Sequence, residues 1–374
     1  MKKSVLFIAI IAMATITISG CSINKSSSSS KEPIKIGVIT SLSGDLSVYG
    51  EGMKNSVLLA IDNSGLKDKI QVIIEDDHSC NITDDVSVTQ KLLNIDKVDA
   101  IVGPMCSSAA LSTIPLTEPL DKILISPMAS SQSLTSSDFK FFFRTIASDA
   151  EKSITVSNYA YNKGFRNAAL IYDIANDSFI QERNDLEKSF TGLGGKIIGQ
   201  ESFKTGDKDF RTQLTKIKSF NADVIFVGGF PKEVGAMLKQ ARELGINLQF
   251  ISTESSVGVP DLLEVGGIAT ENLIYPFADT PSSTQYVKFQ EEYKNKFNAD
   301  PPTYGAPESY DAAVLLIKAI EQSDRSGEGI KKELYSLGQN YHGASGIINF
   351  MENGDVSKPM SIKTVKNGQF VNAE

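Results

Sequence analysis

Three short hydroxyl-rich segments each follow an apolar run that predicts a β-strand. The runs and the segments after them are Ala100–Gly103 before Pro104–Ser108, Ile123–Ser126 before Pro127–Ser131, and Leu248–Ile251 before Ser252–Ser256. Serine side chains at the start of a helix either cap it or, with the helix N–H groups, bind a carboxylate. Glu254, in the third segment, could supply a carboxylate for a cation.

Each of these segments taken alone favours simple helix capping. The carboxyl ends of parallel strands, however, meet at one edge of an open sheet, and ligands bind at that edge. Three such segments, one of them with an acid, therefore predict a site for a small polar ligand that carries both signs of charge.

Residues suited to catalysis or to metal binding are scarce. The chain has two histidines, His78 and His342, far apart in sequence. His78 follows Glu75-Asp76-Asp77, which suggests a metal site, but its place directly after an apolar run favours a solvated strand end. The motifs G-x-S-x-G and H-E-x-x-H do not occur. A nucleophilic serine needs a base within hydrogen-bond reach. We therefore expect a protein that is not an enzyme and uses neither a cofactor nor a metal.

Strand and helix patterns alternate along the chain, which predicts parallel sheets flanked by helices. Met53, Val57 and Ile61 recur at four-residue spacing and so share one face of a helix. Further helices are predicted to end at Gly164 and Gly245. The other expected strands are Ile34–Ile39, Ile70–Ile74, Ala168–Tyr172, Lys196–Phe203 and Asp223–Val227, and the other helices are Val86–Leu93, Gln181–Phe190 and Phe210–Ile217.

Two such alternating series, the second beginning near Asp149, predict an α/β protein with two doubly wound lobes. The last third departs from the alternation. It has helical patterns over Ser282–Phe297 and Glu308–Ile320, and then short strands after Gly346 with hairpin turn signals at Asn353-Gly354 and Asn367-Gly368. Such a tail is expected if the chain crosses between the lobes more than twice.

The N-terminus has the order of a secretory signal. Lys2 and Lys3 precede an apolar stretch from Val5 to Ile18 that is too short to span a bilayer comfortably, and small residues lead to Cys21. The run Ile18-Ser19-Gly20-Cys21 resembles the lipobox of bacterial lipoproteins. That resemblance implies a signal peptide over residues 1–20, a lipid on Cys21 and anchorage to the outer side of the cell membrane. An uncleaved anchor or an ordinary signal peptide is the alternative.

Residues 21–32 include five consecutive serines and are predicted to form a flexible tether. Loss of Lys2 and Lys3 with the signal lowers the formal charge from −8 by two, to −10. Nucleic-acid binding needs faces rich in Lys and Arg, so a chain this acidic is a poor candidate for it. With Cys21 assigned to lipid, Cys80 and Cys106 remain, and in an oxidising compartment they form either a disulfide or two separate buried thiols.

Several motifs, in this order and spacing, resemble the type I periplasmic binding proteins, and within them the leucine/isoleucine/valine-binding group of ABC importers. The motifs are Ile36–Gly44 with Tyr49-Gly50, Glu75–Asp77 with Cys80, Val102–Pro104 with Cys106–Ser108, Ile125–Pro127, Phe142–Thr145, Ala168–Asp173, Gly228–Phe230, and Tyr304-Gly305 with Tyr310–Ala312. The resemblance implies two lobes that close like a flytrap about a three-strand hinge. It places lobe 1 at residues 33–146 plus 276–346, and lobe 2 at 147–275 plus 347–374.

The same resemblance implies roles for particular residues. Ser107 and Ser130 match positions that bind a ligand α-carboxylate. The backbone of the Met128-Ala129 segment and the acid Glu254 match positions that hold an α-ammonium. Tyr49 and Phe230 match aromatic positions of the pocket, Ser178 falls nearest a position where a tyrosine is common, and Cys80 and Cys106 match a disulfide.

These expectations together describe a lipid-anchored solute-binding protein of an ABC importer, most simply for an amino acid. Its partners would be the solute and the permease subunits in the membrane, and we expect a monomer. Ser178 and Met128 depart from the usual residues and leave branched-chain specificity open. The alternatives are the same fold binding an amide, a urea-like or an aromatic acid solute, or a ligand-sensing receptor ectodomain.

Overall fold

The computed structural model describes residues 32–135, 139–257, 260–278 and 283–373. Cys21 and the tether before Glu32 lie outside the described residues. Within them, no helix is both long and apolar enough to cross a membrane. Residues 33–374 form one compact unit built around two large sheets.

The first sheet has five parallel strands in the order β2-β1-β3-β4-β5. Its strands are β1 (Ile34–Thr40), β2 (Ile70–Asp76), β3 (Ala100–Val102), β4 (Ile123–Ser126) and β5 (Phe142–Arg144). Side chains on both faces of β1, among them Val38 and Ile39, are fully buried. Burial of both faces explains why the strand is a continuous apolar run and does not alternate with polar residues.

The second sheet has seven strands in the order β15-β14-β10-β9-β8-β6-β7. Five of them are parallel, namely β6 (Asn167–Asp173), β7 (Lys196–Phe203), β8 (Val224–Gly228), β9 (Gln249–Ser252) and β10 (Ile274–Ala278). The last two, β14 (Met360–Lys366) and β15 (Gln369–Asn372), run antiparallel to their neighbours. They join at Asn367-Gly368, where both residues have positive φ (52° and 69°), so the predicted hairpin turn is confirmed.

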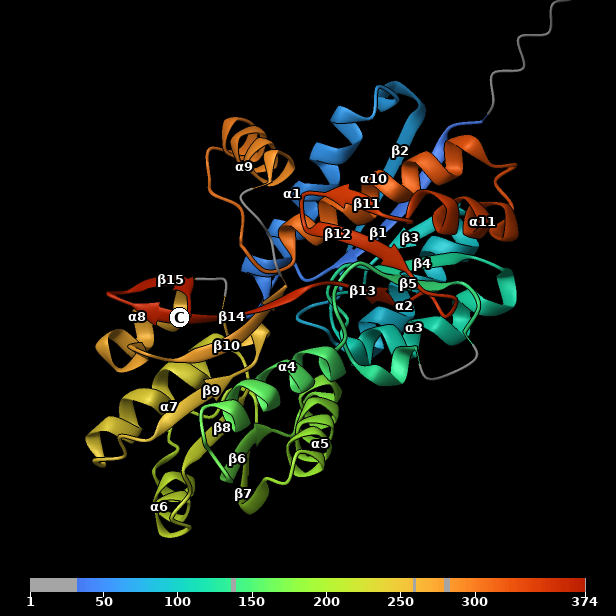
Figure 1. Ribbon diagram of the computed structural model, residues 1–374. Helices are drawn as coiled ribbons and strands as arrows, with labels where there is room; N and C mark the ends of the chain where they lie inside the picture. The colour runs from blue at the N-terminus through green and yellow to red at the C-terminus, as the bar shows by residue number, and fades with distance from the viewer. Residues whose placement is uncertain (1–31, 136–138, 258–259, 279–282, 374) are drawn as a thin grey trace, which may run out of the picture. The chain divides into compact units, whose positions relative to one another are not determined.

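Helices cover both faces of each sheet, which confirms the predicted doubly wound α/β fold (Figure 1). Met53, Val57 and Ile61 lie on the buried face of α1 and pack against β1 and α10. The helices are α1 (Ser47–Asn63), α2 (Ile82–Lys91), α3 (Ser107–Thr117), α4 (Asp149–Asn162), α5 (Asp177–Gly192), α6 (Arg211–Ser219), α7 (Pro231–Glu243), α8 (Asp261–Gly266), α9 (Thr284–Phe297), α10 (Ala306–Gln322) and α11 (Gly327–Leu337). The start predicted for α9, at Ser282, lies outside the described residues.

Some elements differ from the expected ones. Helix α11 begins at Gly327-Glu328-Gly329, where glycines hide a helical pattern, and the Ser326 hydroxyl caps it by accepting from the Gly329 N–H. Strand β10 contains Pro276, a residue depleted in strands, and pairs there with β14 at Ile362. A small third sheet is made of β11 (Tyr341–Gly343), β12 (Gly346–Phe350) and β13 (Val356–Ser357).

The chain crosses from one large sheet, with the helices that pack on it, to the other after β5, after β10 and after β13 (Figure 1). The third sheet packs with the first, since Ile348, Phe350 and Val356 lie in the same core as β1. Strands β14 and β15 instead extend the second sheet. The residue boundaries given above for the lobes stay a prediction.

A buried ion pair joins two of these crossings. Arg144, at the end of β5, donates from Nε and Nη2 to the two carboxylate oxygens of Asp355, each at 2.6 Å. Its Nη1 donates to the Ser131 carbonyl at 2.8 Å, and Nη2 also donates to the Thr135 hydroxyl at 3.0 Å. Arg144 is fully buried and Asp355 is 4% exposed. A two-pronged pair of this kind sets both distance and orientation, so it holds the 130–135 segment against the crossing strands.

Removal of one partner would leave the other as an uncompensated buried charge. We therefore expect Arg144→Met to lower the free energy of unfolding by about 3–5 kcal/mol. The double variant Arg144→Met with Asp355→Leu should recover much of the loss, because neither charge is then left alone. Urea unfolding followed by circular dichroism measures both.

A matched control is Arg211→Met, which removes an arginine from an exposed pair with Glu243 and should change stability little. Equal effects at Arg144 and Arg211 would contradict the role given to the buried pair.

Candidate functional site

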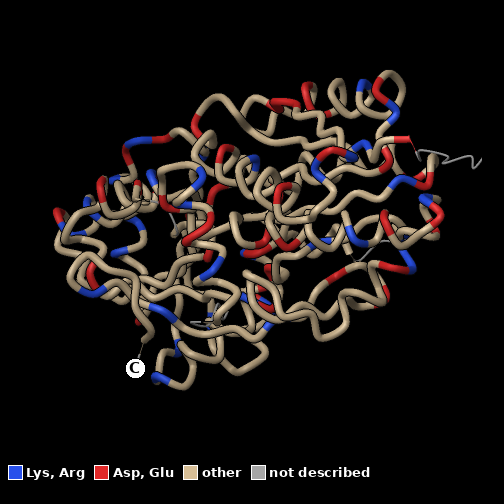
Figure 2. The backbone as a smooth tube through the Cα atoms, turned by 90° about the horizontal axis from the view of Figure 1, so that it is seen from above, with Lys and Arg blue, Asp and Glu red and all other residues tan. Residues whose placement is uncertain are grey.

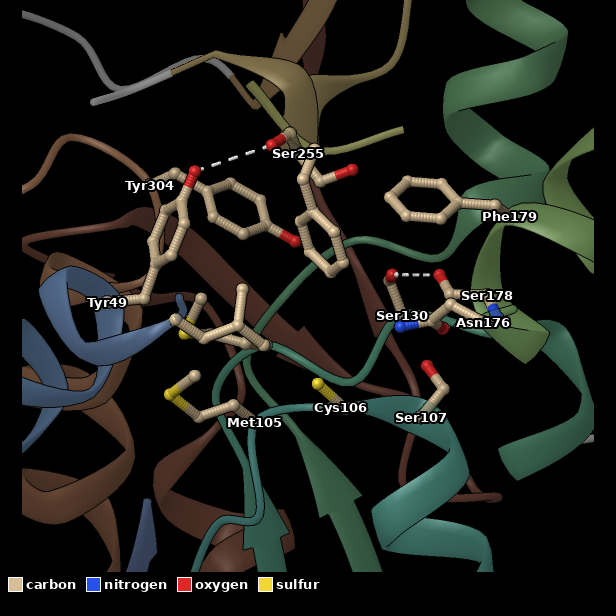
Figure 3. Close-up of a pocket in the computed structure, with 13 residues that line it drawn as sticks. Tyr49, Met105, Cys106, Ser107, Ser130, Asn176, Ser178, Phe179, Ser255 and Tyr304 are labelled. Carbon is tan, nitrogen blue, oxygen red and sulfur yellow. Dashed lines mark hydrogen bonds between the residues drawn. The ribbon is translucent and has the colours of Figure 1, made fainter. Parts of the chain in front are cut away.

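The carboxyl ends of strands from both large sheets surround a cavity (Figure 3). The space between its walls is about 450 Å³ when the open mouth is included. The lining residues are Leu46, Tyr49, Met105, Cys106, Ser107, Met128, Ser130, Asn176, Ser178, Phe179, Phe230, Ser255 and Tyr304. The structure thus brings residues of all three hydroxyl-rich segments to one place.

Of the predicted ligand residues, six line the cavity: Tyr49, Ser107, Met128, Ser130, Ser178 and Phe230. Ala129 and Glu254 do not line it. Ala129 is fully buried beside Ile39 and Leu124, and its N–H donates to the Ser126 hydroxyl at 3.0 Å. Its part in the site is to fix the backbone of the segment that carries Met128 and Ser130.

Ser107, Ser130 and Ser178 form the hydroxyl side of the cavity. Ser107 is the first residue of α3, and its Oγ accepts from the Ser131 N–H at 3.1 Å, which leaves its own proton to be donated. Ser178 donates to Asp149 Oδ2 at 2.6 Å. Because that bond uses the Ser178 proton, the 3.2 Å contact between Ser130 and Ser178 has Ser130 as the donor. Ser178 lies on α5, between β6 and β7 of the second sheet, and Ser130 follows β4 of the first sheet. This bond therefore spans the cleft between the two large sheets (Figure 3).

Aromatic rings form the other walls. Tyr49 and Tyr304 meet edge to face with 6.0 Å between ring centroids, and Phe179 and Phe230 do so at 5.1 Å. The Tyr49 hydroxyl donates across the cleft to the Ser255 carbonyl at 3.5 Å. These apolar faces, with Met105 and Met128 beside them, suit a ligand whose body is apolar.

Phe179, Tyr304 and Ser255 line the cavity, although none of them was predicted as a ligand residue. Phe179 and Ser255 directly follow Ser178 and Glu254, both predicted, so adjacency was the available signal. Tyr304 comes from a distant part of the chain, just before α10, and only the fold brings it to the cavity.

Glu254 lies behind the cavity wall and is 2% exposed. Its Oε1 accepts from the Ala278 N–H at 3.0 Å, and its Oε2 is 3.0 Å from Nζ of Lys152. Lys152 is also 3.3 Å from Asp149 Oδ1, and its Nζ lies 5.8 Å from the centroid of the Tyr304 ring. The acid expected to face a ligand ammonium therefore already has an internal cation beside it.

Electrostatics at this cluster keep Lys152 charged. Burial alone would lower the pKa of Lys152, but the attraction of Glu254, helped by Asp149, outweighs it and sets that pKa well above its usual value. Burial, with the nearby charge of Asp149, raises the pKa of Glu182 well above its ordinary range.

The disulfide between Cys80 and Cys106 is present, which settles the alternative left open by the sequence. Cys106 lines the cavity and immediately precedes Ser107 at the start of α3. Cys80 ends a run of three residues with positive φ, together with His78 and Ser79, after β2. The bond thus ties the loop that presents Ser107 to the neighbouring strand end.

Neither histidine lies at the cavity. His78 is an exposed side chain with Nδ1 3.2 Å from Asp84 Oδ2, and His342 is on β11. In the described part of the chain, no cluster of three or more His, Cys, Asp or Glu side chains is arranged to hold a metal ion.

Residues 33–369 match the profile of the family described as periplasmic binding protein. The chain belongs to the periplasmic binding protein family. Family membership confirms the resemblance seen in the sequence and confirms that the protein binds solutes and is not an enzyme. It also places the protein outside the cytoplasm.

Curated relatives agree with this placement. The Leucine-, isoleucine-, valine-, threonine-, and alanine-binding protein of Pseudomonas aeruginosa is 26% identical over 341 residues, which cover 87% of each chain. The Leu/Ile/Val-binding protein of Escherichia coli K12 is 26% identical and covers 87% of this periplasmic binding protein and 88% of the relative.

Solved structures share the fold. The leucine-binding protein LivK of Thermotoga maritima has a TM-score of 0.84 at 29% identity, covering 91% of this chain and 98% of the other. LivJ of Streptococcus pneumoniae, solved with isoleucine, has a TM-score of 0.81 at 28% identity, covering 90% and 97%. A Rhodopseudomonas palustris solute-binding protein solved with 4-hydroxybenzoate scores 0.81 at 20% identity and shows the fold alone.

Removal of the disulfide tests its contribution to stability. The two cysteines are 26 residues apart, and a loop of that length predicts a loss of about 3–4 kcal/mol in the free energy of unfolding for Cys80→Ser with Cys106→Ser. Urea unfolding measures the loss. The control is the wild-type protein under reducing conditions, which should approach the double variant, and identical stabilities of oxidised wild type and variant would contradict the prediction.

Proposed function

We propose that this periplasmic binding protein binds an amino acid in the cavity between its lobes and delivers it to the permease of an ABC importer. The observation that carries the proposal is the chemistry of the cavity. Hydroxyls stand at the start of α3 on one side, carboxylates lie behind the opposite wall, and aromatic rings lie between. Amino-acid binding by the relatives named above supports the same assignment.

Ser107 and Ser130 are the groups we assign to the ligand carboxylate. Ser107 has a free proton because its oxygen is already an acceptor, and it sits at the N-terminal end of an 11-residue helix, which favours an anion. Ser130 can turn its proton from Ser178 to the ligand at little cost, because one hydrogen bond replaces another.

The ammonium is assigned to the backbone of Met128 and to the charge of Glu254. Since Lys152 already lies against one Glu254 oxygen, Glu254 acts here through its charge behind the wall. Asp149 adds a second carboxylate, joined to the cavity through Ser178. Tyr49, Phe179 and Phe230 would enclose the ligand side chain.

Binding energy would come from closure around the ligand. Bonds already cross the cleft from the 130–133 segment, because Ser131 and Ser133 donate to Asp177 Oδ2 at 3.1 and 3.2 Å. Such contacts hold the closed arrangement and break when the lobes separate. A closed surface of this kind is what a permease can distinguish from the empty, open protein.

The Ser107 hydroxyl gives the first test. A charge-assisted hydrogen bond contributes about 1.5–3 kcal/mol, so Ser107→Ala should weaken amino-acid binding about 10- to 100-fold. Calorimetric titration with leucine, isoleucine and valine measures the change. Ser112→Ala, on the same helix but bonded to the Ala109 carbonyl, is the matched control and should bind as the wild type does.

The same titration decides between solutes. If the wild-type protein binds none of the amino acids but gives a binding isotherm with an amide or with benzoate, the solute is an amide or an aromatic acid and not an amino acid. If the wild type binds an amino acid and Ser107→Ala binds it with the same affinity, the proposed function stands. The assignment of Ser107 to the ligand carboxylate is then wrong.

We also propose that the protein is held at the membrane by lipid on Cys21. The support is the sequence before Cys21, which lies outside the described residues, together with a family that works outside the cytoplasm. Stable anchoring takes two or more acyl chains, which lipoprotein maturation supplies. A serine-rich tether would keep the binding lobes at high local concentration near the permease.

Replacement of Cys21 tests the anchor. Cys21→Ser in the full chain should move the protein from the membrane fraction to the soluble extracytoplasmic fraction, because the lipid attachment atom is gone. Fractionation and immunoblotting follow the change. Cys80→Ser with Cys106→Ser, which keeps Cys21, is the control and should stay with the membrane. A Cys21→Ser protein that stays there too would argue for an uncleaved anchor.

A further inference from the structure

The cavity has a polar end and an apolar end. Ser107, Ser130 and Ser178 lie together on one side of the view in Figure 3, and Tyr49 and Met105 lie on the other side. Five lining residues of the apolar end belong to one hydrophobic core, that of the first sheet: Leu46, Tyr49, Met105, Met128 and Tyr304. With the solute carboxylate assigned to Ser107 and Ser130, the solute side chain extends toward this apolar end.

Little room is left at the apolar end. Its five side chains are only 4–8% exposed, so water reaches little of their surface. Protein interiors are packed nearly as densely as crystals of small molecules, and a solute side chain that enters needs space that a wall residue holds or gives up. The residue of this wall that can move therefore decides which solute side chains fit.

Three of the five are held by specific contacts. The Tyr49 hydroxyl donates to the Ser255 carbonyl at 3.5 Å, and its ring meets that of Tyr304 edge to face at 6.0 Å. Met105 Sδ accepts from the Thr40 hydroxyl at 3.3 Å. Each of these side chains would lose a contact if it moved to make room for a solute.

The Met128 side chain is held by packing alone. A β-carbon built at Gly305 would lie 2.5 Å from Met128 Sδ and 2.7 Å from its Cε, so the thioether lies directly on the Gly305 backbone. Gly305 has a φ of 85°, which favours glycine and so keeps that space free of a side chain. Methionine is unbranched and adapts its shape, whereas Leu46, the fifth residue, is branched and has less rotamer freedom.

We propose that the Met128 side chain determines which solute side chains the cavity accepts, because it fills the apolar end against Gly305 and can adjust its shape there. The inference rests on the proposed function and narrows it to amino acids with aliphatic side chains, up to the size of leucine or methionine. An aromatic ring is wider and rigid, and it would need the space that Met128 occupies, which overpacks the wall.

The experiment measures a ratio of two affinities, so a general loss of binding does not imitate the expected result. Calorimetric titrations use leucine and phenylalanine as probes. The wild type should bind leucine at least about 10-fold more tightly than phenylalanine. Met128→Ala removes Cγ, Sδ and Cε but keeps the backbone that we assign to the ammonium, and it should raise the affinity for phenylalanine relative to leucine by about 10-fold or more.

Further variants serve as controls. Met128→Leu keeps most of the volume and should keep the preference for leucine. Met128→Val frees less space than alanine and should give an intermediate ratio, and it carries the test if Met128→Ala does not fold. Met237→Ala removes the same atoms from a fully buried methionine in the core of the second sheet, which does not line the cavity, and should leave the ratio unchanged. Circular dichroism of each variant reports folding.

Four outcomes overturn the inference. A wild type that binds phenylalanine as tightly as leucine rejects the size limit and leaves amino-acid binding standing. An unchanged ratio in the folded Met128 variants, with leucine still bound, rejects the role of Met128 alone. An equal shift in Met237→Ala shows that the ratio follows general loosening of the fold. A wild type that binds none of the amino acids rejects both the proposed function and the inference.

Discussion

The contact on which the binding site depends is the two-pronged pair between Arg144 and Asp355. It joins the end of β5 to the segment before β13, which are far apart in sequence, and it also holds the Ser131 carbonyl and the Thr135 hydroxyl. The segment so held carries Ser130 into the cavity. A buried pair of charges is a costly way to join strands, but the planar guanidinium sets an orientation that apolar packing would leave loose.

A second feature of the site is that the charged side chains are buried directly behind the uncharged residues that line the cavity. The lining offers hydroxyls, aromatic rings and methionines, and the charged groups are buried behind Ser178 and Tyr304. Buried charges act strongly because little water screens them, and they need not move when the ligand arrives. Positions of acidic and basic residues are interspersed along the described backbone, as Figure 2 shows.

On the hydroxyl side of the cavity, the disulfide and helix α3 together fix the position of Ser107. Cys106 is bonded to Cys80, and Ser107 begins α3 directly after it. Ser107 is therefore fixed from both directions, by a covalent bond on one side and by a helix on the other. A fixed hydroxyl loses little freedom when it binds, which is the physical advantage of building the carboxylate side from such a turn.

Much of this protein could be predicted from the chain alone. Apolar runs such as Ile34–Ile39 and helix faces such as Met53, Val57 and Ile61 are local patterns, and local patterns are decided by neighbours in sequence. The order of turn motifs likewise led to the family and to six of the thirteen lining residues, including Ser107, Ser130 and Phe230. Where local signals were weak, as at Pro276 in β10 or the glycines that open α11, the elements were missed because tertiary pairing and capping outweigh propensity there.

The sequence alone predicts the kind of fold, the compartment to expect and residues that could meet a ligand's head group. That Tyr304 reaches the cavity, and that Lys152 lies against Glu254, follows only from the packing of distant segments. Lys152 and Glu254 are separated by about a hundred positions, and nothing in either neighbourhood of the sequence requires the other. The pairing follows from the packing of α4 against β10 and β14, beside the turn Glu254–Ser256. The strength of a charge depends on such surroundings and not on residue type.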